Sequence, residues 1–96
     1  MTDDTSAEIT KALSHPIRLA YLRALREHKI LSPSDYAKQS GKPLGNVSYH
    51  VKALADAKVI KVKERVPRRG AMESRYSLNG RRAGIALRVI DLLAIA

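Results

Sequence analysis

The chain has 96 residues, 45% of them hydrophobic and 28% charged, which favours one small globular domain and excludes a disordered polypeptide. It has no cysteine, which excludes disulfides and thiolate metal sites and fits a reducing compartment. Eighteen lysines and arginines against nine aspartates and glutamates give a formal charge of +9, which favours a polyanionic partner.

Neither end of the chain has the features of a targeting or membrane segment. Residues 1–5 are polar and acidic, unlike a secretory signal, and we expect them to be flexible. The most apolar segment, Ile85 to Ala96, contains charged residues and is too short to span a bilayer, which needs about 20 residues. We therefore expect a cytoplasmic protein without membrane association.

Capping and proline signals predict two helices in the first third of the chain. Thr5 and Glu8 have the spacing of a capping box, so a short helix begins there. A second helix over residues 16–27 starts with Pro16, which suits a first helical turn because its missing N–H would have no intrahelical partner. Apolar residues on two sides of this helix predict a central position. Residues 29–31 are expected to be briefly extended.

A helix-turn-helix unit is predicted over residues 32–58. Ser32 is the cap of its first helix, and Gly41 ends that helix because glycine tolerates a left-handed conformation. The second helix covers about residues 44–58. Its apolar residues recur at i, i+4 and i+7 and should face the core: Val47, Val51 and Leu54.

The opposite face of this second helix is the predicted contact surface for DNA. Amide and hydroxyl groups can read base edges, and lysine suits a phosphate or a guanine. Free backbone N–H groups at the start of the helix suit a phosphate. The residues assigned to this surface are Lys42, Asn46, Ser48, Tyr49, His50 and Lys52. The same pattern also fits an ordinary polar helix surface, so it does not decide the function alone.

A β-hairpin, or wing, is predicted over residues 59–78, where the hydrophobic period changes to two. Residues 67–70 are expected to form its connecting loop. The inward positions are Ile60, Val62, Tyr76 and Leu78. The outward positions of the first strand are Lys61, Lys63 and Arg65.

The charge of the hairpin adds weight to a DNA-binding function. Its basic residues are opposed only by Glu64 and Glu73, and like charges on one strand destabilise the hairpin unless an anion lies against them. Lysines that protect an edge strand explain part of this charge, but they do not explain two arginines at the tip. The residues assigned to DNA are Lys63, Arg65, Arg68, Arg69 and Arg75.

A final helix is predicted over residues 81–96. Its apolar residues surround nearly the whole circumference, so part of that surface should be covered by a partner. A twofold dimer is the commonest solution, and the residues assigned to the dimer interface are Ile85, Val89, Leu92 and Leu93. Two alternatives are a helix packed wholly inside one subunit and a natural chain that continues beyond Ala96.

The order of the elements is four helices, a hairpin and a fifth helix. It predicts a single domain over residues 1–96 that is mainly α with a small β-hairpin, a winged helix-turn-helix. Three segments resemble the ArsR-like winged helix-turn-helix transcription regulators: Leu13-Ser14-His15-Pro16-Ile17-Arg18, the run from Asn46 to Leu54, and Pro67-Arg68-Arg69-Gly70-Ala71. The resemblance covers about residues 9–78, and its most specific part is Ser48 to Leu54.

The resemblance implies how the chain would act. The helix over residues 44–58 would enter the major groove, with Ser48 and Tyr49 where family members contact bases. Members of the family work as symmetric dimers held by terminal helices, on inverted-repeat operators, usually as repressors. Their metal sensors use cysteines near the third helix, or Asp and His pairs on the last helix. This chain has no cysteine and only Asp91 on its last helix, so metal sensing is not carried over.

The remaining chemistry of the sequence offers no other function. The three histidines, His15, His28 and His50, lack the i, i+4 pairing of a helical zinc site, so we expect no metal or cofactor. His50 is expected to hydrogen-bond to backbone or to DNA. There is no cysteine nucleophile, glycine-rich phosphate loop or paired carboxylates beside a histidine, so an enzyme is not expected. No effector ligand is identified.

The sequence therefore predicts a homodimeric, sequence-specific regulator of transcription that binds double-stranded DNA, as a repressor on an inverted-repeat operator. The alternative is a winged-helix module used for protein–protein contact or for non-specific architectural DNA binding. The polar residues Asn46, Ser48 and Tyr49 favour base reading over contacts to the backbone alone.

Overall fold

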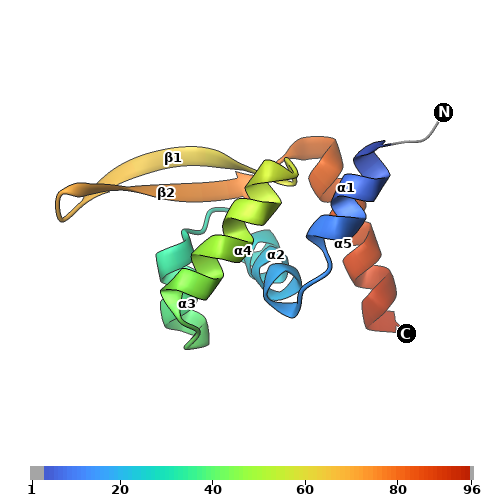
Figure 1. Cartoon of the computed structure of the whole chain (residues 1–96), viewed down its shortest axis with the longest axis horizontal. Coiled ribbons are helices and arrows are strands. Elements are labelled where there is room, and N and C mark those ends of the chain that lie inside the picture. The colour runs from blue at the N-terminus through green and yellow to red at the C-terminus, as the bar shows by residue number, and fades with distance from the viewer. Residues whose placement is uncertain (1–3, 96) are drawn as a thin grey trace.

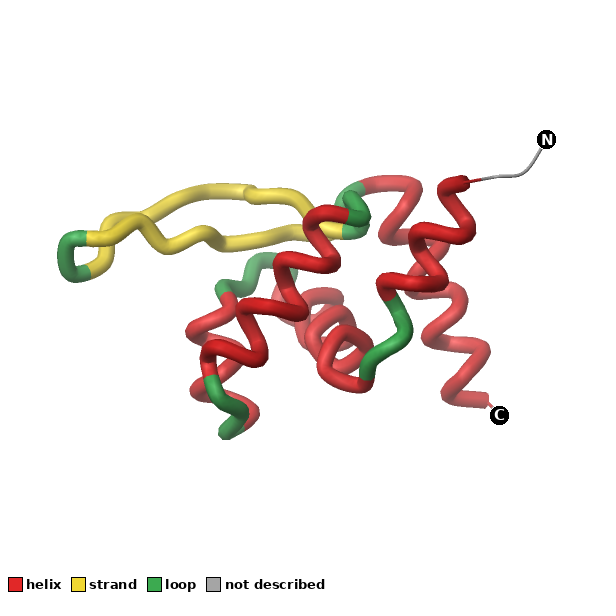
Figure 2. Tube along the Cα trace, viewed as in Figure 1, coloured by secondary structure: helices red, strands yellow, loops and turns green. Residues whose placement is uncertain are grey.

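The computed structural model describes residues 4–95, which form five helices and a two-stranded antiparallel sheet (Figures 1 and 2). The elements are α1 (Asp4–Ala12), α2 (Pro16–His28), α3 (Pro33–Ser40), α4 (Leu44–Asp56), β1 (Ile60–Arg68), β2 (Ala71–Leu78) and α5 (Gly80–Ile95). Their order is the predicted one, and the winged helix-turn-helix fold class is confirmed. No helix among the described residues has the length and apolar character needed to cross a membrane.

Helices α2 and α3 begin at side-chain caps. The Ser32 Oγ accepts a hydrogen bond from the N–H of Asp35 at 3.1 Å, and α3 ends at Gly41 with a φ of 72°, as the sequence predicts. The cap of α2 is His15, whose Nδ1 accepts a hydrogen bond from the N–H of Ile17 at 3.1 Å. The sequence places His15 at this helix start but does not identify it as the cap.

Two helix boundaries differ from the predicted ones. Helix α1 begins at Asp4, so Asp4 and Thr5 are helical rather than part of a flexible terminus. The rest of that predicted segment, residues 1–3, lies outside the described residues. Helix α4 ends at Asp56, two residues early, and Lys58 with a φ of 62° turns the chain toward β1.

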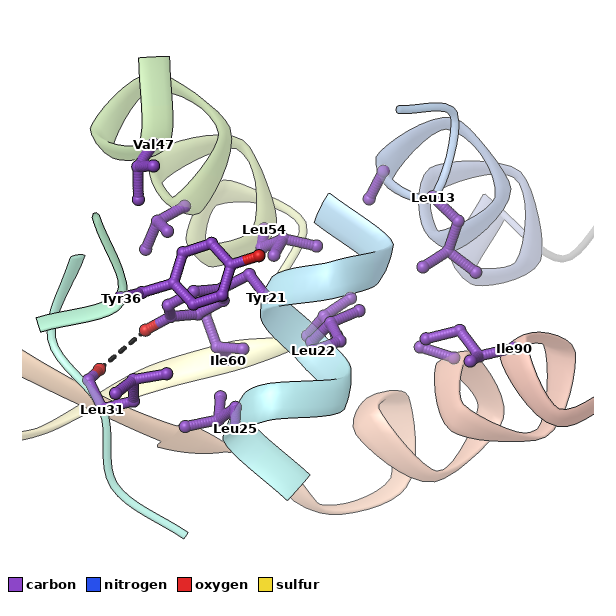
Figure 3. Packing of buried hydrophobic residues seen from close by; sticks show 14 of the residues in the cluster. Leu13, Tyr21, Leu22, Leu25, Leu31, Tyr36, Val47, Leu54, Ile60 and Ile90 are labelled. Atoms are coloured by element: carbon purple, nitrogen blue, oxygen red, sulfur yellow. Dashed lines mark hydrogen bonds between the residues drawn. The ribbon is translucent and has the colours of Figure 1, made fainter. Parts of the chain in front are cut away.

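The core surrounds α2, which confirms its predicted central position (Figure 3). The buried residues of α4 are Val47, Val51 and Leu54, as predicted, and those of α2 are Tyr21, Leu22 and Leu25. The hydroxyl of Tyr21 donates a hydrogen bond to the carbonyl oxygen of Leu31 at 2.6 Å. Burial, and then the charge of Tyr76, raise the pKa of Tyr21, so this hydroxyl remains a protonated donor.

The strands of the hairpin are longer than the sequence predicts. Pro67 and Arg68 belong to β1, and only Arg69 and Gly70 form the turn, with φ values of 49° and 83°. Positive φ at both central residues is what a type I′ turn requires. Arg68 and Ala71, which flank this turn, form a hydrogen-bonded pair. Hydrogen-bonded and non-hydrogen-bonded pairs alternate along an antiparallel ladder, so the next pair, Pro67 and Met72, exchanges no hydrogen bond. The missing N–H of the proline therefore faces the open edge of the strand.

A β-bulge at Lys63 changes which side chains share a face. Before the bulge Lys61 lies opposite Ser77, and after it Arg65 lies opposite Ser74. Ser74 and Ser77 are three residues apart on β2 and therefore point to opposite faces of the sheet. Lys61 and Arg65, which lie opposite them, point to opposite faces as well. The prediction that the basic residues of this strand share one outward face is therefore wrong.

The hairpin is anchored at its base and projects from the helices (Figure 1). Leu31 and Tyr76 exchange two backbone hydrogen bonds of 3.1 Å, so the extended stretch predicted before α3 joins the sheet at one residue. Ile60, near this bridge, is buried. Val62 lies opposite the half-buried Tyr76 and so shares the predicted inward face, but it is 42% exposed, because the strand has already left the helices that would cover it.

Candidate nucleic-acid interface

The face of α4 opposite its buried residues is open to solvent. Its exposed polar residues are Asn46, Ser48, Tyr49 and Lys52, and Tyr49 is 68% exposed. Lys52 contacts Asp56 through an ion pair of 3.2 Å on the helix surface, which is weak because water screens it. Pro43, the N-cap of α4, has no side-chain acceptor, so its side chain caps none of the first backbone N–H groups of α4. Such N–H groups suit a bound anion. Lys42, half-buried, precedes them.

His50 is packed against residues at the start of α2, unlike the exposed polar residues of α4. Its Nδ1 accepts a hydrogen bond from the Nε of Arg18 at 3.0 Å, and its ring stacks on that of His15 with centroids 3.9 Å apart. The ring of Tyr49 meets it edge-on, with centroids 5.1 Å apart. Burial, then the charges of His15 and Arg18, lower the pKa of His50, so the neutral ring is favoured. Its hydrogen-bond partner within the chain is thus a side chain, whereas the sequence suggests the backbone or DNA.

The basic residues of the hairpin form two groups. In the first, Arg75 lies 3.3 Å from an Oε of Glu64 and 3.7 Å from one of Glu73, and Arg68 lies 3.5 Å from Glu73. The second group is exposed and makes no ion pair within the part of the chain that the structure describes: Lys61, Lys63, Arg65 and Arg69. Only this second group presents uncompensated charge to solvent.

Glu73 ties the hairpin to α3. Its carboxylate accepts a hydrogen bond from the hydroxyl of Ser34, and its side chain is 14% exposed. The hydrogen bond from Ser34 is the largest cause that lowers the pKa of Glu73, and the charges of Arg68 and Arg75 act in the same direction against the effect of burial. The ionised carboxylate thus holds two arginines at a fixed place. From the sequence, Glu73 could be recognised only as a negative charge among the basic residues of the hairpin, and not as a link to α3.

The polar face of α4 and the hairpin border one groove of about 610 Å³. Ser48 and Lys52 line it from α4, and Met72 and Ser74 line it from β2. The fold therefore brings the predicted recognition residues and the wing to adjacent surfaces. Among the described residues, no group of three or more His, Asp or Glu side chains is placed to hold a metal ion.

Helix α5 exposes apolar residues at its C-terminal end. Leu92 and Leu93 are 64% and 54% exposed, whereas Ile85 and Val89 are half-buried and pack against the core. Of the four predicted interface residues, Leu92 and Leu93 are thus exposed, whereas Ile85 and Val89 already pack against the core of their own subunit. Arg82 of α5 donates a hydrogen bond of 3.1 Å to the Glu8 carboxylate of α1, which joins the two terminal helices.

Residues 13–63 match the family model of a helix-turn-helix domain. No match to this sequence was found among the curated proteins. Among solved structures, the transcriptional repressor PagR of Bacillus anthracis is 29% identical, with a TM-score of 0.70 over 94% of this chain and 93% of that one. Rv0081 of M. tuberculosis is 26% identical, with a TM-score of 0.68 over 93% of this chain and 85% of that one.

A further similar structure is a homodimeric winged helix-turn-helix DNA-binding domain, the fragment 1–100 of Mb0332 from Mycobacterium bovis, which is a possible ArsR-family transcriptional regulator. It is 23% identical, with a TM-score of 0.69 over 96% of this chain and 77% of that one. At this identity the likeness concerns the fold. It agrees with the winged helix-turn-helix fold of this chain.

Proposed function

Since this chain belongs to the helix-turn-helix domain family, we propose that it is a sequence-specific transcription repressor that binds an inverted-repeat operator as a homodimer. A DNA-binding regulator is the function that this family and the ArsR-like winged fold support. Repression is supported by the similarity to PagR, which is itself a transcriptional repressor.

The observation that carries the proposal is the polar face of α4 beside a hairpin with unpaired basic residues. Helix α4 lies in the major groove, where Asn46, Ser48 and Tyr49 contact base edges. Lys42, Lys52 and the free N–H groups at the start of α4 contact phosphates. His50 belongs to this surface through its contact with Tyr49.

The wing follows the DNA backbone beside the recognition helix. Lys63, Arg65 and Arg69 supply phosphate contacts, because their charges are not compensated by nearby carboxylates. Arg68 and Arg75 share Glu73, so they contribute more to the shape of the wing than to its net charge. The turn places Arg69 at the tip, where an arginine can enter a minor groove.

Dimerisation is proposed to use the terminal helices. A second copy covers the exposed Leu92 and Leu93, and Ile85 and Val89 complete the contact. The homodimeric state of the Mb0332 fragment, which has a similar fold, supports this arrangement. Residues 1–96 then act as one domain, in which 32–58 reads DNA, 59–78 forms the wing and 81–96 joins the subunits. Two recognition helices in a dimer contact half-sites about 34–36 Å apart.

Selection of binding sites from random duplex DNA tests the function directly. We expect a palindromic motif to emerge. Tyr49→Ala should then weaken binding to that operator about tenfold or more, with little change for a scrambled duplex, because one base contact is worth roughly 1–3 kcal/mol. His28→Ala, which removes an exposed ring from the end of α2, is the matched control and should bind both duplexes like the parent. Equal losses on both duplexes for Tyr49→Ala would contradict the assignment of α4.

A further inference from the structure

A chain of side-chain contacts links α1 and α2 to the exposed Tyr49 of α4. The Nη1 of Arg18 donates hydrogen bonds to the carbonyl oxygens of Lys11 and Ala12, at 3.3 and 3.4 Å, which hold the guanidinium at the end of α1. The Nε of the same guanidinium donates to His50 at 3.0 Å. The ring of His50 meets that of Tyr49 edge-to-face at an interplanar angle of 82°. Three helices therefore converge on one aromatic contact.

His15 holds the His50 ring by stacking on it. The two rings stack with an interplanar angle of 24°. The ring of His15 is itself fixed, because its Nδ1 accepts the hydrogen bond from Ile17 that caps α2. His50 is thus held by a stack on one side and by the Arg18 hydrogen bond at its edge, and it provides a rigid support for Tyr49.

Tyr49 also borders an open space. A hollow of about 370 Å³ between α1, α2 and α4 is lined by Tyr49, Ala53 and Asp56 on one side and by Arg18 on the other. A rotation of the Tyr49 side chain into this hollow would withdraw the hydroxyl from the exposed face of α4. The edge contact with His50 opposes that rotation, since an aromatic pair in this geometry favours the observed orientation by about two- to twelvefold.

Building on the proposed function, we propose that Arg18 and His50 are positioning residues for DNA recognition. They hold the Tyr49 ring in the orientation that reads the operator, and they do so only while the Nδ1 of His50 carries no proton.

Protonation of His50 removes the acceptor on which this arrangement depends. An Nδ1 that bears a proton cannot accept the N–H of Arg18, and the resulting imidazolium lies beside a guanidinium and a second imidazole. The groups whose charges act on His50 are His15, the cap of α2, and Arg18 of α2, and the ring of Tyr49 contacts it from α4. Glu8 and Lys11 of α1 and Asp56 of α4 line the neighbouring hollow together with Arg18 and Tyr49. Glu8 is paired with Arg82, so it does not offset the added charge.

The burial and the neighbouring charges that lower the pKa of His50 keep its ring neutral at neutral pH. The support of Tyr49 is therefore present above the usual histidine value of 6.5 and is lost in more acid solution. Operator recognition should fall in the same range of pH.

The ratio of two dissociation constants, for a scrambled duplex and for the selected operator, isolates this effect. A positive charge added near phosphates strengthens binding to both duplexes, so this general effect of protonation cancels in the ratio. We would measure both constants by fluorescence anisotropy from pH 8 to pH 5 at constant ionic strength. For the parent protein we expect the ratio to fall as the pH is lowered, by at most about tenfold, because the ring contact that holds Tyr49 is worth no more than that.

Three variants separate positioning from general structure. His50→Phe keeps a ring but removes the acceptor, so its ratio at pH 8 should already equal the low value that the parent reaches in acid, and it should not change with pH. In a Tyr49→Ala background the same change should alter the ratio less than twofold, because His50 acts through Tyr49. His15→Asn removes a histidine but keeps a cap for α2, so the dependence on pH should remain.

Arg18→Lys, which keeps the charge, is a second test if His50→Phe does not fold, and it should lower the ratio similarly. The inference is overturned if the parent ratio does not change with pH, if His50→Phe discriminates as well as the parent, or if its effect adds to that of Tyr49→Ala. Failure of the proposed function looks different, since the parent protein would then select no operator at all.

Discussion

Arg69→Gln tests whether the unpaired charge at the tip of the wing contacts a phosphate. Arg69 is exposed and has no ion pair among the described residues. Arg75 lies on the same hairpin but is held by Glu64 and Glu73. The two substitutions remove the same formal charge, so Arg75→Gln is a matched control for charge alone.

The expected size follows from the release of counterions. Each phosphate contact changes the slope of log K against log salt by about 0.9. Between 50 and 200 mM salt, one contact is therefore worth about 3.5-fold in affinity, and the two copies of Arg69 in a dimer are worth about twelvefold. The loss of DNA affinity caused by Arg69→Gln should be largest at 50 mM salt and about twelvefold smaller at 200 mM salt.

Titrations of a fluorescent duplex at four salt concentrations measure these slopes. Arg75→Gln should leave the slope within about 0.3 of the parent value, because a guanidinium bound to two carboxylates releases few counterions. Two equal slopes for the two variants would refute the reasoning. They would mean that net charge, and not the pairing seen in the hairpin, governs the salt dependence.

Three further outcomes follow from the packing. Tyr21→Phe should lower the free energy of unfolding in urea by about 1 kcal/mol and no more, since the Leu31 carbonyl keeps its hydrogen bond from the Tyr76 N–H; a loss above about 3 kcal/mol would contradict this. Leu92→Lys should give a folded monomer by light scattering where the parent is a dimer, and an unchanged dimer would argue against α5 as the interface. Because the folded pKa of His50 is lowered, its contribution to stability is present above pH 6.5 and lost as pH falls through the folded value; urea midpoints of His50→Phe should lack this component.

The helices could be predicted because their signals are local. Ser32 and Gly41 bound α3 by capping chemistry that needs no distant partner. The seam of Val47, Val51 and Leu54 follows from helical spacing alone. For the same reason the exposed polar residues of α4 could be assigned to one face from the order of the amino acids.

The hairpin and the details of the site could be predicted only in part. A proline fits inside a strand where its nitrogen faces the open edge of the sheet. Whether Pro67 does so depends on the pairing register of the two strands, which the alternation of apolar and polar residues does not reveal. The sequence therefore predicts a loop at Pro67. The bulge at Lys63 likewise shifts the face of every residue after it. The bond between Arg18 and His50 joins residues 32 positions apart, and no local pattern predicts such a pair.

The division of α4 into two faces has a consequence for how such regulators diversify. Its buried seam contributes to folding, whereas Asn46 and Ser48 lie in solvent and support no packing. Substitutions at exposed positions of this kind usually change stability by less than about 0.5 kcal/mol. If these two residues contact bases as proposed, new operator preferences can arise by point changes there while the scaffold stays intact, so descendants of one ancestral gene can acquire separate target sites without losing the fold.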